Sequence, residues 1–183
     1  PMGALRGSDK FPDMKALGDA IHDKGLKYGL TIALAEKSCD GFTGLYGHEA
    51  DDARAFAAWG VDYLVLDACG AEALFSSAAE IQAAAQKMAE ALRAAGKPIA
   101  LGLSNAQGAR AWAAKAGVNV WRTAKDVTPT WDSISESGFD TAEAGASTWA
   151  DPGLLQIGND GMSPEEYRTH LNLWAVRGAP RSE

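Results

Sequence analysis

Helical and strand-like segments alternate along the chain, and an apolar run directly follows each helical segment that ends in glycine. The first helical segment places Met14, Leu17 and Ile21 on one face, the spacing of a helix with one buried side. Helical patterns occupy 11–25, 49–60, 77–96 and 107–117, and the apolar runs occupy 26–34, 61–67, 98–104 and 118–124. These runs contain few polar positions, which is typical of parallel strands covered on both faces. The pattern predicts an α/β fold with a parallel sheet.

Two helix starts carry capping signals. Ser77 and Glu80 have the spacing of a capping box, in which each side chain satisfies a backbone N–H of the first turn. Near the end of the chain, Ser163 is followed by a proline at the first helical position and by Glu166, a second capping box. This combination predicts a helix over 163–176.

Two architectures with parallel sheets fit this alternation. A doubly wound dinucleotide-binding fold should show G-x-G-x-x-G directly after a strand. The nearest string, GFTGLYG at 41–47, has a different spacing and lies in a loop well after its strand. A (βα)8 barrel instead gathers polar residues at the carboxyl-terminal ends of several strands. Those ends carry Asp67, Ser104 and Arg122, with Asp126 shortly after, so the sequence predicts a fold of the TIM-barrel type.

Composition and charge exclude several classes of function. With 183 residues, 46% hydrophobic and 22% charged, the chain has the make-up of one globular domain. A net charge of −7 argues against nucleic acid or an anionic membrane as a partner, because both need clustered Lys and Arg. No apolar run approaches the roughly 18 residues of a membrane-spanning helix. The first residues, PMGALRGSDKFP, lack the layout of a signal peptide and begin without Met, as at a processed or cut end. A small molecule, or a second copy of the chain, is the expected partner.

Only two cysteines occur, Cys39 and Cys69. Two thiolates cannot form a four-thiolate metal site, and no histidine lies at ligand spacing from either cysteine. We therefore expect no metal and no cofactor. From the residues alone, two free and partly buried thiols remain an open alternative.

Asp67 and Asp126 are the strongest catalytic candidates. Each follows an apolar strand, and one βαβ unit separates the two strands. In a barrel, strands this close direct their carboxyl-terminal loops into one mouth, so the two carboxylates can face each other. Glycoside hydrolysis requires such a pair, one at the anomeric carbon and one exchanging a proton with the leaving oxygen. The alternative is that each Asp caps a helix or lies in a solvated loop; Asp67 fits that less well because no helix follows it directly.

Other polar and aromatic residues are weaker candidates. The histidines lie in helical patterns or a loop, without an acid and a nucleophile around them, so packing or surface roles are expected. They are His22, His48 and His170. Ser104 and Asn105 either face the barrel mouth or form an ordinary turn. Tryptophans near the catalytic end either stack on a sugar or fill the core, and packing is the expectation for each. They are Trp121, Trp131 and Trp149.

Four longer stretches of sequence are more specific indicators of a protein family than the single residues above. In chain order they are KFPDMKALGDAIHDKGLKYGL, SCDGFTGLYGHEADDARAFAAWGVDYLVLDAC, NVWRTAKD and WADPGLLQIGNDGMSPEEYRTHLNLWAVRGAP. In this order and at this spacing they resemble glycoside hydrolase family 27, the α-galactosidases and α-N-acetylgalactosaminidases. The resemblance runs from Lys10 to Pro180, and Ser38 to Cys69 is its most specific part.

The resemblance implies roles for five residues. Asp67 matches the family's nucleophile, and Asp126, four residues after Arg122, matches its general acid/base. Arg122 matches a residue that contacts the substrate. Cys39 and Cys69 match a disulfide pair that ties the loop after one strand to the end of the next. A disulfide implies an oxidising, extracytoplasmic location: secreted, periplasmic or lysosomal.

Three positions depart from the family's pattern. Thr31 stands where an aromatic residue is usual, Val65 where a lysine is usual, and Gly153 where a second aspartate is usual. In the family these groups contact the sugar. The departures imply weak galactoside binding or a sugar other than galactose, and restoring the pattern with Val65→Lys and Gly153→Asp is expected to strengthen galactoside binding.

The resemblance also implies that residues 1–183 form a single partial catalytic domain. About five or six βα units of the eight-unit barrel are represented. The N-terminal strands, the final strand and the family's C-terminal β-sandwich have no counterpart. The strands at 26–34 and around 154–157 are therefore expected to be unpaired edges.

The function implied is that of a retaining exo-glycosidase acting on terminal α-galactosides of an oligosaccharide or glycoconjugate. One alternative is a sugar-binding or scaffold relative with impaired catalysis, and another is an inactive fragment of a longer enzyme. A phosphate-binding barrel is a further alternative, for which GNDG at 158–161 would supply the phosphate loop.

Overall fold

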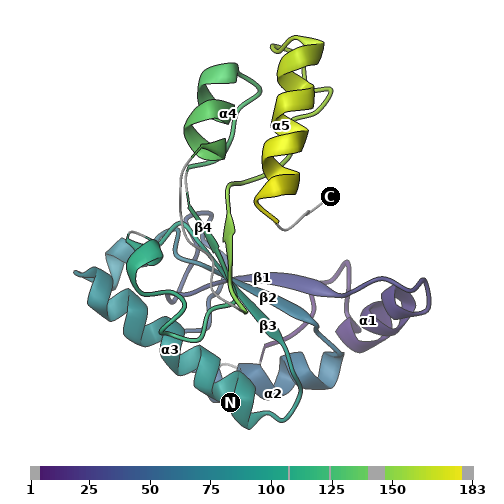
Figure 1. The fold of residues 1–183 in the computed structure, drawn as a ribbon. Coiled ribbons are helices and arrows are strands. Elements are labelled where there is room, and N and C mark those ends of the chain that lie inside the picture. Colours follow the sequence, from purple (N-terminus) through teal and green to yellow (C-terminus); the bar gives the residue numbers. More distant parts are fainter. Residues whose placement is uncertain (1–4, 107, 124, 140–146, 179–183) are drawn as a thin grey trace.

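The chain forms one parallel sheet with helices on one side, in a computed structural model that describes residues 5–106, 108–123, 125–139 and 147–178. The strand order is β1-β2-β3-β4-β5, the order along the chain (Figure 1). The strands are β1 (Gly29–Ala33), β2 (Tyr63–Asp67), β3 (Ala100–Ser104), β4 (Val120–Arg122) and β5 (Trp149–Asp151). The helices are α1 (Met14–His22), α2 (Glu49–Trp59), α3 (Ala78–Ala94), α4 (Trp131–Gly138) and α5 (Pro164–Val176), with 3-10 turns η1 (Ala71–Ala73) and η2 (Ala109–Ala111). The predicted α/β architecture with parallel strands is confirmed.

The main core lies between the sheet and helices α2 and α3, which cover the same face (Figure 1). Alternate residues of β2 and β3 point into it, as the period of a strand requires. The fully or nearly fully buried side chains include Leu64, Leu66, Leu101, Leu103, Phe56, Met88 and Leu92. Each such side chain contributes about 1.5–3 kcal/mol relative to full exposure. The other residues of these strands, among them Tyr63 and Val65, therefore lie on the opposite face of the sheet.

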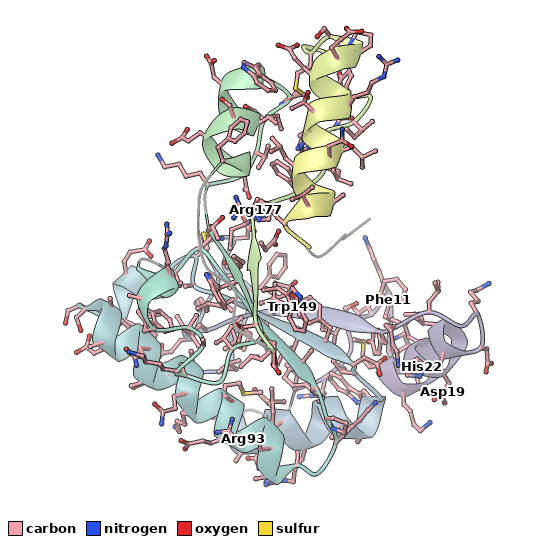
Figure 2. The ribbon with its side chains drawn as sticks, viewed as in Figure 1. Phe11, Asp19, His22, Arg93, Trp149 and Arg177 are labelled. Atoms are coloured by element: carbon pink, nitrogen blue, oxygen red, sulfur yellow. A yellow bond between two sulfur atoms is a disulfide. The ribbon has the colours of Figure 1, made fainter. Side chains whose placement is uncertain are left out.

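Helices α4 and α5 form a second, smaller unit. They pack on each other beyond the carboxyl-terminal ends of β4 and β5 (Figure 1). Its buried centre is Val127, Ile134 and Trp174. The guanidinium of Arg177 reaches from α5 to the end of α4, where it donates hydrogen bonds to Ser137 O (3.0 Å) and Gly138 O (2.9 Å) (Figure 2).

Most helix starts and ends follow the sequence signals. Helix α2 ends at a left-handed Gly60 (φ 84°), and α5 has the complete capping box of Ser163 and Glu166. Ser77 caps α3 by accepting from the backbone N–H of Glu80. The Glu80 carboxylate instead accepts from the N–H and hydroxyl of Ser76, one residue before the cap, so the predicted reciprocal pair is shifted by one position.

One helical prediction was wrong, and one helix was missed. In the described residues 108–117, only η2 is helical, and turns follow it. A short helix has an unfavourable nucleus, and here the turns bury Trp112 and Ala113 against the main core. Conversely, α4 was not predicted, because its eight residues are too few for a clear period. Its signal is the cap Thr130, whose side chain accepts from Ser133 N.

The strand expected around 154–157 is also not formed. The strand before α5 is β5, at Trp149–Asp151, and Pro152 and Gly153 follow it directly. Gly153 has φ 113°, which takes the chain out of the sheet. The next backbone donor with a defined partner, Gln156 N, bonds to a side chain of α5 and not to a strand.

The sheet is open in the part of the chain that the structure describes. There β1 pairs only with β2, and β5 pairs only with β4, so these two strands are its edges. The edge at β1 matches the expectation from the sequence, and the second edge is β5 instead of 154–157. Among the described residues, no helix combines the length and apolarity needed to cross a membrane.

Candidate active site

The polar residues predicted from the strand ends form a row across the sheet. Ala33 pairs with Asp67, Asp67 with Ser104, and Arg122 with Asp151. Ser104 and Arg122 each lie one position beyond the last paired residues of β3 and β4. The carboxyl-terminal ends of four neighbouring strands therefore present an acid, a hydroxyl, a guanidinium and a second acid at one level.

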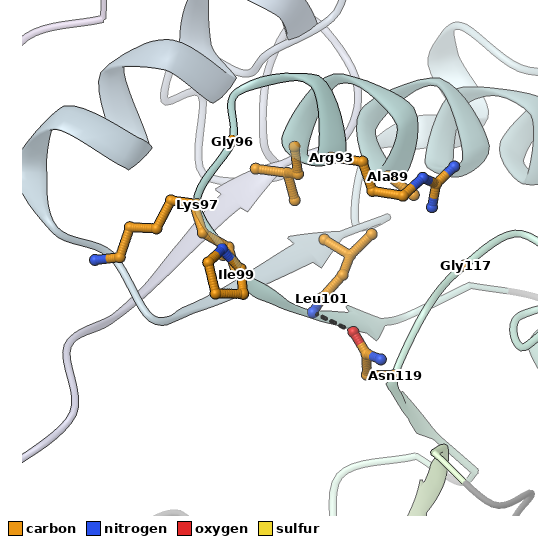
Figure 3. A pocket seen from close by; sticks show the side chains of 10 residues that line it. Ala89, Arg93, Gly96, Lys97, Ile99, Leu101, Gly117 and Asn119 are labelled. Atoms are coloured by element: carbon orange, nitrogen blue, oxygen red, sulfur yellow. Dashed lines mark hydrogen bonds between the residues drawn. The ribbon is translucent and has the colours of Figure 1, made fainter.

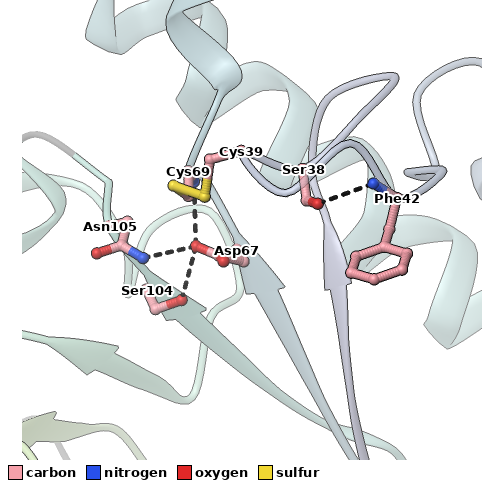
Figure 4. The surroundings of a disulfide bond; sticks show 7 residues. All are labelled: Ser38, Cys39, Phe42, Asp67, Cys69, Ser104 and Asn105. Carbon is pink, nitrogen blue, oxygen red and sulfur yellow. Dashed lines mark hydrogen bonds between the residues drawn. A yellow bond between two sulfur atoms is a disulfide. The ribbon is translucent and has the colours of Figure 1, made fainter.

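Asp67 is held by three hydrogen-bond donors, all directed at its Oδ1 (Figure 4). The donors are the amide of Asn105 (2.7 Å), the backbone N–H of Cys69 (3.0 Å) and the hydroxyl of Ser104 (3.2 Å). Ser104 and Asn105 therefore face the Asp67 carboxylate at the ends of the strands. From the sequence, they could either face the barrel mouth or form an ordinary turn. In the described structure Oδ2 receives none of these bonds. Asp67 is therefore fixed in orientation through Oδ1.

The disulfide between Cys39 and Cys69 is present, as the resemblance implied. The Cα atoms are 5.4 Å apart, and the bond closes a loop with a sequence separation of 30 residues (Figure 4). It ties the segment after β1 to the residue whose N–H binds Asp67. The segment is also braced internally, because Phe42 N donates to the Ser38 hydroxyl and Ser38 N donates to Phe42 O. The covalent link therefore restrains the wall of the site and one donor to the carboxylate.

Arg122 lies between two carboxylates. Its guanidinium donates a 2.8 Å hydrogen bond to Asp126 Oδ1, and its register partner on β5 is Asp151. The Arg122 side chain is 16% exposed, whereas that of Asp126 is 89% exposed. Asp126 is thus a solvent-facing group held by a largely buried cation. Asp67 and Asp126 are hydrogen-bonded to different residues. Asp67 is the last residue of β2, and Asp126 lies shortly after the end of β4.

Asp151 is a site residue that sequence reasoning missed. Burial raises its pKa, against the opposing effects of a hydrogen bond from Gly153 N (2.9 Å) and of the Arg122 charge. Burial and the nearby Asp151 raise the pKa of Tyr63 to about 12, although Arg122 acts in the opposite direction. The sequence signal that could have identified Asp151 is its place at the end of an apolar strand, directly before a proline. Its burial is a property of the folded sheet and could not be seen in the sequence.

A groove of ≈ 990 Å³ runs along the face of the sheet that carries this row. Its wall includes Thr31, Val65, Arg122, Asp151 and Leu154. Two of the three positions that depart from the family's pattern, Thr31 and Val65, therefore line it. A second hollow, of ≈ 360 Å³, reaches Asp67 from the side of the edge strand β1. Asp67 is accessible from that side.

A further hollow of ≈ 390 Å³ lies at the opposite ends of the strands (Figure 3). Its lining includes Arg93 and Lys97 near the end of α3, and Asn119, whose Oδ1 accepts from Leu101 N at 2.9 Å. Because β3 and β4 begin there, this hollow is remote from Asp67 and Arg122. We assign it no part in the chemistry.

Most of the weaker candidates take structural positions, but Trp149 lies at the groove. The ring of His22 bonds to Asp62 (2.6 Å), and His170 is fully buried in α5. Trp121 is 2% exposed and fills the core, whereas Trp149 is 44% exposed at the groove. Trp131 packs against the small cluster between α4 and α5. His48 directly precedes α2 and makes no capping hydrogen bond with its side chain.

Comparison with known proteins gives consistent relatives. The family described as alpha galactosidase A matches residues 4–182. The chain is 40% identical over 178 residues to an alpha-galactosidase of Cyamopsis tetragonoloba, covering 93% of this chain and 42% of that protein. It is 34% identical over 196 residues to an alpha-N-acetylgalactosaminidase of Gallus gallus, covering 94% and 45%.

A solved structure extends the comparison to the fold. The crystal structure of alpha-galactosidase I from Mortierella vinacea superposes with a TM-score of 0.83 at 27% identity. The match covers 98% of this chain and 54% of that one. The chain thus spans less than half the length of the curated relatives it matches here. The order of its strands, the row of polar residues at their ends and the match over residues 4–182 place the chain in glycoside hydrolase family 27, the alpha-galactosidase family.

Proposed function

We propose that the chain carries the catalytic residues of a retaining exo-α-galactosidase. In this proposal Asp67 is the nucleophile, Asp126 is the general acid/base and Arg122 binds a hydroxyl of the sugar. The observation that carries the proposal is the fixed Asp67 carboxylate, with three donors on Oδ1 and Oδ2 left for a substrate. A carboxylate held by three donors in this way is fixed in orientation, as a nucleophile must be.

The proposed reaction has two steps. In the first, Asp67 Oδ2 attacks the anomeric carbon, the glycosidic bond breaks, and Asp126 gives its proton to the leaving oxygen. In the second, Asp126 takes a proton from water, the water oxygen attacks the anomeric carbon, and the bond to Asp67 breaks. Both steps invert the anomeric centre, so the product keeps the substrate's configuration. Retention of this kind needs carboxyl groups about 5–5.5 Å apart in the complex with substrate.

The selectivity follows from the groove. Arg122 is the cation at the row of strand ends, and a guanidinium suits the paired hydroxyls of a sugar. Val65 has no hydrogen-bonding group where the family's pattern has a lysine, and Thr31 has no ring to stack on the sugar where the pattern has an aromatic residue. Each missing charge-assisted contact is worth about 1.5–3 kcal/mol. We therefore propose weak binding of galactosides, or a preference for a related sugar with fewer polar contacts at this wall.

The domain organisation and the location are part of the same proposal. Residues 1–183 form a partial (βα)8 domain, whose open edges at β1 and β5 are closed by strands outside the described part of the chain. The disulfide favours an extracytoplasmic compartment, because cytosolic thiols are kept reduced. The substrate is a terminal galactoside of an oligosaccharide or glycoconjugate.

The test is turnover of a chromogenic α-galactoside, followed by trapping with an activated fluorinated galactosyl donor. The proposal expects a mass increase on the tryptic peptide that contains Asp67 and its loss in Asp67→Asn. Asp132→Asn, an exposed change in the first turn of α4, is the matched control and should label like the parent chain. Label on any other residue, or inverted product, would contradict the assignment.

A second candidate function is sugar binding without turnover. The observation that favours it is that the groove wall has Val65 in place of the pattern's lysine and Thr31 in place of its aromatic residue, while the carboxylates remain. Galactose binding seen by NMR, together with no turnover and no labelled peptide, would select this candidate.

A further inference from the structure

Helix α5 holds the segment after β5 at two points. The indole Nε1 of Trp174 donates a 2.6 Å hydrogen bond to Gly153 O, and Gln156 N donates a 3.0 Å bond to Nε2 of His170. His170 and Trp174 are four residues apart, so they project from one face of the helix. Their rings also contact edge to face, with centroids 4.1 Å apart. Both side chains are at most 1% exposed. The segment 153–156 is therefore clamped at its two ends by one buried pair.

The bond to Gln156 requires His170 to be neutral with its hydrogen on Nδ1. A ring nitrogen can accept only while it carries no hydrogen. Nδ1 is buried and has no hydrogen-bond partner in the described structure. Burial also lowers the pKa of His170, which keeps the neutral form. A histidine that only packs can carry its hydrogen on either ring nitrogen. His170 is restricted to one tautomer, because its Nε2 must accept the hydrogen bond from Gln156 N.

The clamped segment contacts the groups proposed to act on the substrate. Gly153 N holds Asp151 Oδ1, and a Cβ placed on Gly153 would lie 3.1 Å from Arg122 Nη1. The side chain of Gln156 donates a 2.8 Å hydrogen bond to the carbonyl oxygen of Val127, the residue after Asp126. One end of the segment therefore abuts Arg122, and the other end fixes the backbone beside Asp126.

We propose that His170, together with Trp174, is a positioning residue that sets Arg122 and Asp126 through the segment 153–156. Neither side chain touches the groove, so their effect is transmitted by Gly153 and Gln156. The hydrogen bonds that join His170 and Trp174 to the segment 153–156 do not depend on any activity of the chain. Its consequence for substrate binding rests on the proposed function, because that proposal gives Arg122 and Asp126 their roles.

The first test needs no substitution. In a nitrogen-15 NMR spectrum of the chain at neutral pH, His170 should show a bare Nε2 and a protonated Nδ1. The Gln156 amide should exchange slowly with solvent. On acidification, the Gln156 amide should lose its protection together with the protonation of His170, since the charged ring can no longer accept. A protonated Nε2 at neutral pH, or Gln156 protection that is independent of the state of His170, would overturn the inference.

The second test compares three variants. His170→Phe keeps a buried ring without an acceptor and should speed exchange of the Gln156 amide by about tenfold or more. His170→Gln offers an amide oxygen and should restore most of the protection. Asn172→Ala, an exposed change on the same helix, is the control and should behave like the parent chain. The Arg122 Nε–H signal should shift in His170→Phe only. An unchanged Arg122 signal in that variant would show that the segment does not position Arg122.

Galactose affinity separates this inference from the proposed function. If the parent chain binds galactose, His170→Phe should weaken binding by about three- to tenfold, the effect of one lost hydrogen bond. Equal affinity in both chains would overturn the consequence. If the parent chain binds no galactoside, the proposed function fails, while the amide exchange and the Arg122 signal still decide the clamp. If His170→Phe does not fold, the acidification of the parent chain decides it.

Discussion

The amide of Asn105 donates a 2.7 Å hydrogen bond to Asp67 Oδ1, and Asn105 is the non-glycine residue with positive φ (55°) in the described chain. Left-handed backbone is costly for most residues but is tolerated by asparagine. This left-handed conformation of Asn105 therefore lies beside the proposed nucleophile. Strain of this kind is typical of functional sites, where the surrounding fold holds it in place.

Substitutions at Asn105 separate the backbone from the hydrogen bond. Asn105→Gly should relax the backbone and lose the bond, so stability is kept while activity falls by about tenfold. Asn105→Ala should lose the bond and also cost about 1 kcal/mol in stability, because alanine disfavours this φ. Urea unfolding and turnover of a chromogenic galactoside measure the two effects. Equal turnover in the parent chain and Asn105→Gly would show that the amide is not needed to orient Asp67.

Removal of the disulfide should lower stability strongly. Opening a loop of 30 residues costs roughly 3–4 kcal/mol through the entropy of the unfolded chain. The double substitution Cys39→Ala and Cys69→Ala should therefore shift the urea midpoint to lower concentration, and the parent chain should behave in the same way under reducing conditions. A double variant with the parent midpoint would mean that the unfolded state is not restrained by this bond.

Asp52 should make the protein more stable in mild acid. Its side chain is 2% exposed, with Oδ1 lacking a hydrogen-bond partner in the described structure. Burial, with the nearby carboxylates Asp51 and Glu49, raises the pKa of Asp52 to about 6, against the opposing effect of His48. The folded chain then binds more protons than the unfolded chain between the two pKa values, so stability falls as the pH rises from about 4 to 6.

Asp52→Asn tests this effect. It should stabilise the chain at pH 7, by on the order of 2 kcal/mol, and change stability little at pH 4. Thermal unfolding across this pH range measures the difference, with Asp40→Asn in an exposed loop as the control. If the variant and the parent chain lose stability in parallel from pH 4 to 6, the effect does not come from Asp52.

The two restoring substitutions suggested by the family's pattern should behave differently. Val65→Lys places an ammonium at the groove wall and should strengthen galactose binding by about tenfold or more, measured by calorimetry. Gly153→Asp should not, because Gly153 has φ 113° and a Cβ there would lie 2.6 Å from Val127 Cγ2. That variant should be destabilised. Tight galactose binding by the unmodified chain would contradict the role given to Val65.

The parts predicted well from the sequence are those set by local pattern. Apolar runs identified the strands that end at Asp67 and Arg122, since parallel strands contain few polar positions. The helix with Ser163 and Glu166 was predicted by its cap. These features depend on neighbours within a few residues of the same element.

The parts that were missed depend on tertiary contacts. Burial beside Arg122 raises the pKa of Asp151. Gln156 N donates to a histidine on α5 and not to a neighbouring strand. The residues of η2 have the composition of a helix, but Trp112 is drawn into the core through turns. In each case a contact from another element overrides the local preference.

The two open edges of the sheet are not alike, since β1 offers Gly29–Ala33 and β5 offers Trp149–Asp151. If β5 of one copy pairs with β1 of another, the contact is head to tail, and each copy keeps a free edge at its far end. Such growth either closes into a ring or continues as an open filament, and a dimer paired at one edge alone keeps two free edges and does not stop it. At high concentration, the mass of the isolated chain measured by light scattering should therefore rise beyond two copies without a plateau. A peptide strand that pairs with the free edge of β1 should stop this growth.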